Sequence, residues 1–323
     1  MNCKNKKTEN SGKSCLFPEH SNRRDFLKGL SIAAAAGSAA LTAGCLPSAE
    51  AAPTTEEMKL RWQEFFKKNY RLMTQEEKDA TVARLERLAK IQRDLDVQMS
   101  SQPPLDNVLY GYAFNITRCE GYMECVKACV KENNLDRRTN TQYIRIFEME
   151  PGHLDPGSGD GRFYHEVPVE NKFYMGTQCN HCENAPCTKA CPTKATWREP
   201  DGIVVVDYNW CIGCRYCQAA CPYYGRRFNW GAPEIPKEEI NTRQHYLSNR
   251  IRPKGKMEKC TFCLQRTRQG RLPACVEACP TGARVFGNLL DPDSEIRWVL
   301  ANKKVFRWKE ELGTEPKFWY FID

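Results

Sequence analysis

The chain has 323 residues, a formal net charge of +8 and 18 cysteines. Its lysines and arginines are spread along the sequence, so the charge predicts neither nucleic-acid binding nor attachment to an acidic membrane through a basic block. Cysteines this numerous and this tightly grouped exclude an ordinary reduced cytosolic enzyme. Cys3, Cys15 and Cys45 lie in the first fifty residues and the other fifteen begin at Cys119, which divides the chain into two parts.

Residues 1–51 have the pattern of a twin-arginine export signal. Residues 21–28 read Ser-Asn-Arg-Arg-Asp-Phe-Leu-Lys, and an alanine-rich apolar stretch follows at 29–43. This stretch is short and weakly apolar for a membrane span. The alternative is a surface helix that begins with two arginines. Export in the folded state suits a protein whose cofactors are inserted in the cytoplasm, so we predict a periplasmic location.

Three outcomes are open for the end of this signal. Ala49-Glu50-Ala51 offers a small-residue cleavage site that leaves a mature chain from about Ala52. Cys45 is an alternative as a lipidated cysteine, although Thr42 stands where such sites prefer leucine. Retention as an uncleaved anchor is the third. No later segment approaches membrane-spanning length, so we expect membrane association mainly through partners.

Residues 52–104 are predicted to form a helical hairpin and a linker. Thr54 with Glu57, and Thr74 with Glu77, are capping-box starts. Apolar residues follow at three- and four-residue spacing, which indicates one apolar stripe on each helix. We expect the stripe to pack on the protein's own body, and docking of a partner subunit is the alternative. The stripe residues are Met58, Trp62, Phe65, Val82, Leu85, Leu88, Ile91 and Leu95.

Residues 105–323 are predicted to form one domain of short strands and tight turns around groups of cysteines. Pro200-Asp201-Gly202 is a hairpin turn between two short strands. The last predicted helix carries Ile296 and Val299 on one face, and an aromatic tail follows it. The expected elements are strands at 143–149, 162–174, 195–197 and 203–208, a polar insertion at 224–258 and a helix at 292–312.

The cysteines form four groups with similar spacing. In the third group, cysteines stand at every third residue and a fourth precedes a proline, which is the spacing of bacterial ferredoxins. In the first group, Tyr122 stands where a second cysteine is expected. The groups are Cys119, Cys125 and Cys129; Cys179, Cys182, Cys187 and Cys191; Cys211, Cys214, Cys217 and Cys221; and Cys260, Cys263, Cys275 and Cys279.

This spacing has a geometric cause. A four-iron cluster needs thiolates at the corners of a compact tetrahedron, and a loop with cysteine at every third residue aims three sulfurs inward. The fourth cysteine points away and reaches a neighbouring cluster, so two groups must exchange their last ligands. Zinc is disfavoured because nested runs that end in Cys-Pro are not a zinc pattern. Disulfides are disfavoured because fifteen is an odd number.

Motifs of common catalytic or nucleotide-binding sites are not evident in the sequence. No glycine-rich dinucleotide motif follows a predicted strand, and no Ser-His-Asp arrangement suggests itself. His181 lies inside the second cysteine group. We expect it to be a solvent-facing loop residue, and a hydrogen bond from its ring to a sulfur is the alternative.

Residues 108–320 resemble the four-cluster ferredoxin-like subunits of respiratory oxidoreductases. These include the subunits of dimethyl sulfoxide reductase and polysulfide reductase, the NrfC type and the hydrogenase-linked type. The resemblance implies an α+β fold of two interlocked bacterial-ferredoxin-like folds with long insertions, and the predicted helical hairpin lies outside it. Besides the cysteines, it is carried by 207–217 (DYNWCIGCRYC), 228–230 (FNW), 259–263 (KCTFC) and 272–283 (LPACVEACPTGA).

By this resemblance, the first group pairs with the fourth and the second with the third. Tyr122 at the missing ligand position makes a [3Fe-4S] cluster the simplest outcome at the last site, and a cubane with a non-cysteine ligand or an absent cluster is the alternative. The implied ligand sets are Cys179, Cys182, Cys187 and Cys221; Cys191, Cys211, Cys214 and Cys217; Cys129, Cys260, Cys263 and Cys275, each for a [4Fe-4S] cluster; and Cys119, Cys125 and Cys279.

The resemblance also implies a non-catalytic electron-transfer subunit. It would relay single electrons between an NrfD- or PsrC-like membrane quinone subunit and a periplasmic molybdopterin oxidoreductase or multihaem cytochrome. Fully ligated clusters offer substrate no open position, so the partners do the chemistry. A periplasmic hydrogenase is the alternative partner, and a zinc-stabilised interaction module is the alternative class of protein.

Overall fold

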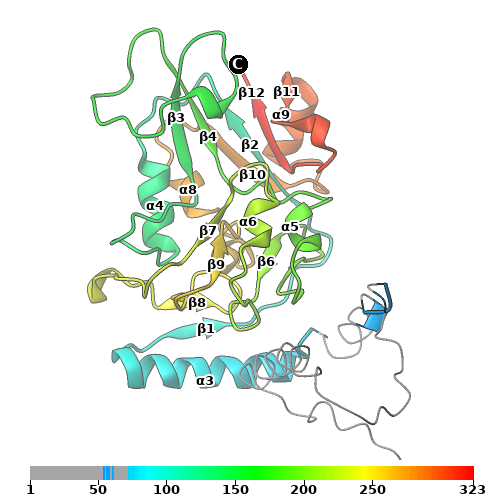
Figure 1. Ribbon diagram of the computed structural model, residues 1–323. Helices are drawn as coiled ribbons and strands as arrows, with labels where there is room; N and C mark the ends of the chain where they lie inside the picture. The colour runs from blue at the N-terminus through cyan, green and yellow to red at the C-terminus, as the bar shows by residue number, and fades with distance from the viewer. Residues whose placement is uncertain (1–53, 55, 59, 62–71) are drawn as a thin grey trace, which may run out of the picture. The chain divides into compact units, whose positions relative to one another are not determined.

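The computed structural model describes residues 54, 56–58, 60, 61 and 72–323 (Figure 1). The chain divides into two compact units, 1–63 and 64–323. In the first unit, the Thr54 amide donates to Glu57 Oε2 at 2.7 Å and the Glu57 amide donates to Thr54 Oγ1 at 3.3 Å, which is the predicted capping box. The export signal and most of the first predicted helix lie outside the described residues.

Helix α3 (Gln75–Arg93) begins with the predicted capping box at Thr74. Val82 is buried and Leu85 packs against the core, so this part of the stripe faces the protein's own body as expected. Ile91 is 80% exposed, and its predicted burial is wrong. The chain turns at Asp94, which adopts a left-handed conformation, and Leu95 is buried where the chain runs on beyond the helix.

A four-stranded sheet runs in the order β10-β2-β12-β11. All residues of its central strand β2 (Tyr110–Asn115) are buried. Strand β2 pairs antiparallel with β10 (Arg284–Asn288) and parallel with β12 (Phe318–Phe321), and β12 pairs antiparallel with β11 (Val305–Phe306). The aromatic tail therefore belongs to the core.

Helix α9 (Glu295–Asn302) packs against this sheet through Ile296 and Val299, as its pattern predicted. The predicted extension of the helix to residue 312 is wrong. The helix stops at Asn302 because the chain returns as β11 to the sheet edge, beside β12, where Val305 pairs with Phe321. A short 3₁₀ turn, η3 (Glu310–Leu312), precedes the final strand.

The remaining strands form two-stranded pairs (Figure 1). The hairpin predicted around residues 200–202 is present as β5 and β6. The strand predicted at 162–174 is wrong except for its last two residues, because Pro168 lacks an amide donor and the strand begins only at Phe173. The pairs are β3 (Arg145–Met149) with β4 (Phe173–Thr177), β5 (Thr196–Arg198) with β6 (Val204–Val206), β7 (Arg226–Phe228) with β9 (Met257–Lys259), and β1 (Gln98–Ser100) with β8 (Arg243–His245).

Short helices follow the cysteine loops. They are too short to be stable alone, so their stability must come from packing and from what the cysteines bind. No helix among the described residues is long and apolar enough to cross a membrane. The helices are α4 (Glu124–Glu132), α5 (Pro186–Lys189), α6 (Tyr216–Ala219), α7 (Leu264–Thr267) and α8 (Ala274–Glu277), with 3₁₀ turns η1 (Pro156–Ser158) and η2 (Lys237–Glu239).

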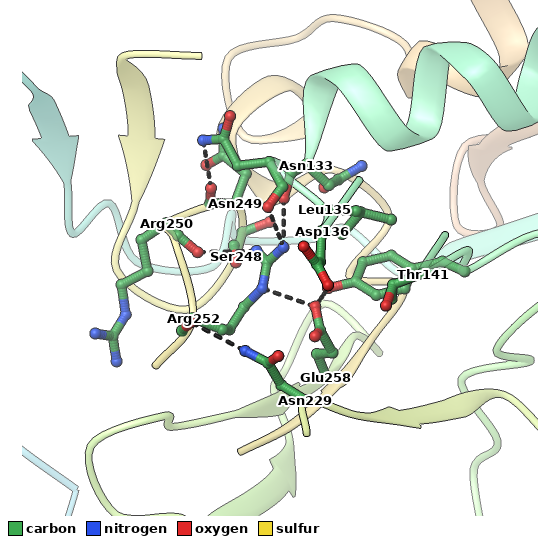
Figure 2. Close-up of polar contacts among 12 residues, drawn as sticks. Asn133, Leu135, Asp136, Thr141, Asn229, Ser248, Asn249, Arg250, Arg252 and Glu258 are labelled. Atoms are coloured by element: carbon green, nitrogen blue, oxygen red, sulfur yellow. Dashed lines mark hydrogen bonds and ion pairs between the residues drawn. The ribbon is translucent and has the colours of Figure 1, made fainter. Parts of the chain in front are cut away.

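Buried arginines that are paired with carboxylates also connect segments that are distant in sequence. Arg252 is 1% exposed, and its Nε lies 2.8 Å from Glu258 Oε2, also buried. Figure 2 shows the guanidinium between Glu258 and Asn133, whose carbonyl oxygen accepts a hydrogen bond from Arg252 Nη2 at 2.6 Å. This arginine fastens the polar insertion to the end of helix α4.

Arg268 makes a second buried ion pair. Its side chain is 1% exposed and its guanidinium contacts Glu199 and Asp201, with 3.0 Å between Nη2 and Asp201 Oδ2. Both carboxylates belong to the turn of the β5–β6 hairpin. Arg268 therefore ties the turn that follows the second cysteine group to the segment that follows α7.

Replacement of Arg268 tests this link. Arg268→Ala leaves two buried carboxylates unpaired, which should cost about 3 to 5 kcal/mol of unfolding free energy. The expected result is a clearly lower thermal midpoint, measured on the cluster-loaded protein by loss of visible absorption. Lys237→Ala is the control, since Lys237 pairs with Asp94 on the exposed surface and should change the midpoint little. An equal midpoint for the two variants would contradict the role given to Arg268.

Candidate metal centres

The fifteen cysteines of residues 72–323 are all free thiols, and they line the interior of the second unit. A buried thiol without a partner is costly to ionise, so a concentration of them indicates that they bind something. Five are only half-buried and the other ten are buried. The half-buried ones are Cys119, Cys191, Cys214, Cys221 and Cys279.

The second and third cysteine groups lie together in space. Burial, and after it nearby thiolates of both groups, raise the pKa of Cys182 to about 12; these neighbours are Cys179, Cys187 and Cys221. Burial likewise raises the pKa of Cys217 to about 11, and again its neighbours come from both groups: Cys187, Cys191 and Cys211. The fold therefore interleaves these two groups.

The first and fourth groups lie together in the same way. Burial raises the pKa of Cys129 well above its ordinary value, and its thiolate neighbours include Cys263, Cys260 and Cys275. Asn133 Nδ2 lies 3.5 Å from Cys129 Sγ and 3.8 Å from Cys263 Sγ, so one amide contacts a thiol from each group. Burial raises the pKa of Cys119 to about 11, with further contributions from Cys125 and Cys279.

Among the described residues, no three Cys, His, Asp or Glu side chains converge closely enough to hold a single metal ion. An iron–sulfur cluster binds each thiolate to a different iron, so its ligands stand further apart than those of one ion.

A small cavity lies where the first group lacks a cysteine. Three thiols line it, those of Cys119, Cys125 and Cys279, together with Tyr122 and Arg284. The Tyr122 side chain is 41% exposed. The nearby Glu120 carboxylate raises the pKa of the phenol.

Several buried N–H donors beside the thiols have no acceptor among the described residues. An unpaired buried donor costs about 1 to 3 kcal/mol, and the sulfides and thiolates of an iron–sulfur cluster are suitable acceptors. The residues present therefore fit such a group. The donors are Gln178 Nε2, Asn180 Nδ2, His181 Nε2, Arg226 Nε and Nη1, and Arg284 Nη2.

His181 is 1% exposed, and its predicted position facing solvent is wrong. Its Nδ1 accepts a hydrogen bond from the Val204 amide at 2.9 Å, and its ring stacks on Phe262 with 3.7 Å between centroids. Burial lowers the pKa of His181 well below its ordinary value, and the charge of Lys259 lowers it further. The histidine is therefore neutral. Its contacts with β6 and with the fourth cysteine group keep it in the interior.

Two buried arginines were missed by the sequence reasoning. Arg226 Nη2 lies 3.0 Å from Cys187 Sγ and 2.9 Å from Thr196 Oγ1. Arg284 Nη1 donates to the Tyr112 hydroxyl at 3.1 Å, and that hydroxyl lies 3.3 Å from Cys275 Sγ. Each arginine stands five positions after the last cysteine of its group, and this shared spacing is the signal that could have found them.

Comparison with known proteins also indicates iron–sulfur clusters. A family model described as a 4Fe-4S dicluster domain matches residues 170–245 and 245–289. The putative dimethyl sulfoxide reductase iron-sulfur subunit of Halobacterium salinarum is 41% identical over 65% of this chain and 78% of its own length. Protein NrfC of Escherichia coli is 37% identical over 67% of this chain and 81% of its own.

One relative aligns over almost the whole chain. A selenate reductase subunit of Mesobacillus selenatarsenatis is 34% identical over 94% of this chain and 97% of its own length. The similarity therefore includes much of the sequence before residue 105, which the resemblance on motifs alone left outside. The N-terminal segment is thus shared with at least one protein of this kind.

Replacement of Gly225 by alanine tests how tightly the cysteine loops pack. A Cβ at Gly225 would lie 2.9 Å from the Cys179 Cα, so Gly225→Ala must displace this cysteine. We expect fewer irons per protein after anaerobic purification than in the wild type. Gly157→Ala is the control, because the added methyl meets only an exposed aspartate side chain at 3.3 Å. Unchanged iron content in Gly225→Ala would contradict the close packing at Cys179.

Proposed function

The chain belongs to the family of iron–sulfur electron-transfer subunits of respiratory oxidoreductases, and we propose that it carries single electrons through four cluster sites. It is an electron-transfer component and does not transform a substrate itself. The observation that carries the proposal is the interleaving of the cysteine groups, second with third and first with fourth, around buried donors that lack acceptors.

We propose the ligand sets that the resemblance implies. The neighbours of Cys182 and Cys217 support the two sets formed from the second and third groups. The neighbours of Cys129 and Cys119 support the two formed from the first and fourth. The sets are Cys179, Cys182, Cys187 and Cys221; Cys191, Cys211, Cys214 and Cys217; Cys129, Cys260, Cys263 and Cys275; and Cys119, Cys125 and Cys279.

The chain's own residues would support electron transfer in three ways. When bound, the clusters supply one-electron redox chemistry. The loops hold the thiolates in fixed positions, so little reorganisation accompanies a change of charge. Buried apolar side chains exclude water from the thiols, and the amide of Asn133 and the guanidinium of Arg226 donate hydrogen bonds to sulfur.

At the site beside Tyr122 we propose a [3Fe-4S] cluster. Three cysteines line that cavity, and the Tyr122 side chain is partly exposed to solvent, which supports a missing fourth ligand. The other three sets each have four cysteines and suit [4Fe-4S] clusters. A cubane with a non-cysteine ligand at this position is the alternative.

We propose that the chain works on the periplasmic side of the membrane, after export by the twin-arginine route. Its partners would be an NrfD- or PsrC-like membrane quinone subunit and a periplasmic molybdopterin oxidoreductase or multihaem cytochrome. The reductase subunits among its relatives favour a terminal reductase over a hydrogenase. A zinc-stabilised interaction module is disfavoured, because the relatives and the matched family are iron–sulfur proteins.

The cluster content tests this function directly. Protein purified without oxygen should contain about fifteen irons and show the EPR signal of an oxidised three-iron cluster. Tyr122→Cys supplies the missing thiolate and should raise the content to about sixteen irons with loss of that signal. Tyr122→Phe is the matched control and should behave like the wild type.

Two outcomes would contradict parts of this proposal. A wild type with about sixteen irons and no three-iron signal would mean that another group completes the Tyr122 site. Freshly assembled protein with stoichiometric zinc and no visible absorption that dithionite bleaches would overturn the electron-transfer function.

The export route is tested on the paired arginines. Arg23→Lys combined with Arg24→Lys should leave the chain in the cytoplasm, because the twin-arginine pattern is then lost. The measurement is the location of the protein after cell fractionation. Lys13→Gln, outside the 21–28 motif, is the control and should not change export. Export of the double variant at the wild-type level would contradict the predicted signal.

A further inference from the structure

Two arginines occupy equivalent places in the two halves of the cysteine-binding unit. Arg226 follows Cys221 by five residues, and Arg284 follows Cys279 by five residues. Each is the first residue of its strand, β7 or β10. Each is almost fully buried, at 1% and 4% exposure. The repeat thus places one guanidinium at the same point of each half.

Arg226 lies between two of the proposed ligand sets. Its Nη2 donates to Cys187 Sγ at 3.0 Å, and its charge also acts on Cys179 of the same set and Cys217 of the next. Its Nε and Nη1 are buried and have no acceptor in the described part of the chain. The guanidinium therefore presents two further donors to the space that the two sets enclose.

Arg284 has the same relation to the other two sets. Its charge acts on Cys119 and Cys125 of the three-cysteine site and on Cys275 of the neighbouring set. It reaches Cys275 through the Tyr112 hydroxyl, which lies between them. Its Nη2 is a buried donor without an acceptor among residues 72–323.

Neither arginine forms an ion pair with a carboxylate among the described residues, which separates them from Arg252 and Arg268. A buried cation without a nearby anion is strongly unfavourable, so a group other than a carboxylate must supply the balancing negative charge. Among the described residues, the thiolates of Cys187 and Cys217 act most strongly on Arg226, and that of Cys125 acts most strongly on Arg284. Because reduction adds negative charge at that point, a fixed cation there favours the reduced form.

We propose that Arg226 and Arg284 each raise the reduction potentials of the two clusters between which they lie. One arginine would thus set the potentials of both clusters in its half of the protein. This inference rests on the proposed function, since it requires that the clusters are bound. It gives the two guanidiniums a positioning role: they set the energy of the electron in each half and do not accept the electron themselves.

The test is a redox titration of the loaded protein followed by EPR. Arg226→Met removes the charge but keeps much of the side-chain volume, and it should shift two of the four cluster potentials to lower values. Arg284→Met should shift the other two. Arg226→Lys keeps the charge but loses the planar donor geometry, so it should shift the same two potentials by less than Arg226→Met.

Arg268→Met is the matched control. It also removes a fully buried arginine, but the partners of Arg268 are carboxylates. It should lower thermal stability without the selective shift of two potentials. Equal potentials in the wild type and in a fully loaded Arg226→Met protein would overturn the proposal, as would the same pattern of shifts in Arg226→Met and Arg268→Met.

A measurement on the wild type covers the case in which the variants fail to bind clusters. Protein labelled with ¹⁵N in arginine side chains should show ¹⁵N hyperfine coupling in pulsed EPR of the reduced clusters. Absence of any coupling in fully loaded protein would overturn the proposal. A wild type without iron would instead contradict the proposed function, so the two failures are distinguishable.

Discussion

The structure depends on one constraint, which is that many sulfur anions must be stable inside a protein of low dielectric constant. Ten of the fifteen cysteines in residues 72–323 are buried, and burial is the largest of the causes that raise the pKa of Cys182 and of Cys260 to about 12. They ionise only if cations, hydrogen bonds and bound metal compensate. Short helices, two-stranded pairs and long loops suit this purpose, because loops can direct backbone and side-chain donors toward a centre.

The buried charges fall into two classes that follow from this constraint. Arg252 and Arg268 are paired with carboxylates and fasten distant segments together. Arg226 and Arg284 are directed at sulfur and leave N–H groups without acceptors in the described part of the chain. The first class holds the loops in place, and the second only becomes favourable when the cysteines carry negative charge. Folding and assembly of the metal centres are therefore expected to be coupled.

The features that could be predicted from the sequence are those that depend on short-range patterns. The cysteine spacing, the β5–β6 hairpin around residues 200–202 and the start of α3 at Thr74 all depend on residues a few positions apart. The central sheet could not be predicted, because β2 pairs with the tail about two hundred residues later through aromatic packing such as Tyr112 on Phe318. His181 and Arg226 were missed for the same reason, since their partners come from other loops.

The charges that the thiols exert on one another support an arrangement of the four proposed sets in one row. Cys125 lies near Cys129 and Cys275 and joins the three-cysteine site to the next set. Cys260 lies near Cys179 and joins the two halves, beside the stack of His181 on Phe262.

Cys187 lies near Cys217 and joins the last two sets. The exposure of the cysteines agrees with this order. Each end set has two half-buried cysteines, whereas the inner set with Cys260 has none and the one with Cys179 has only Cys221. A row that is buried in the middle and more accessible at both ends would suit a carrier that accepts an electron from one partner at one end and delivers it to another partner at the other end.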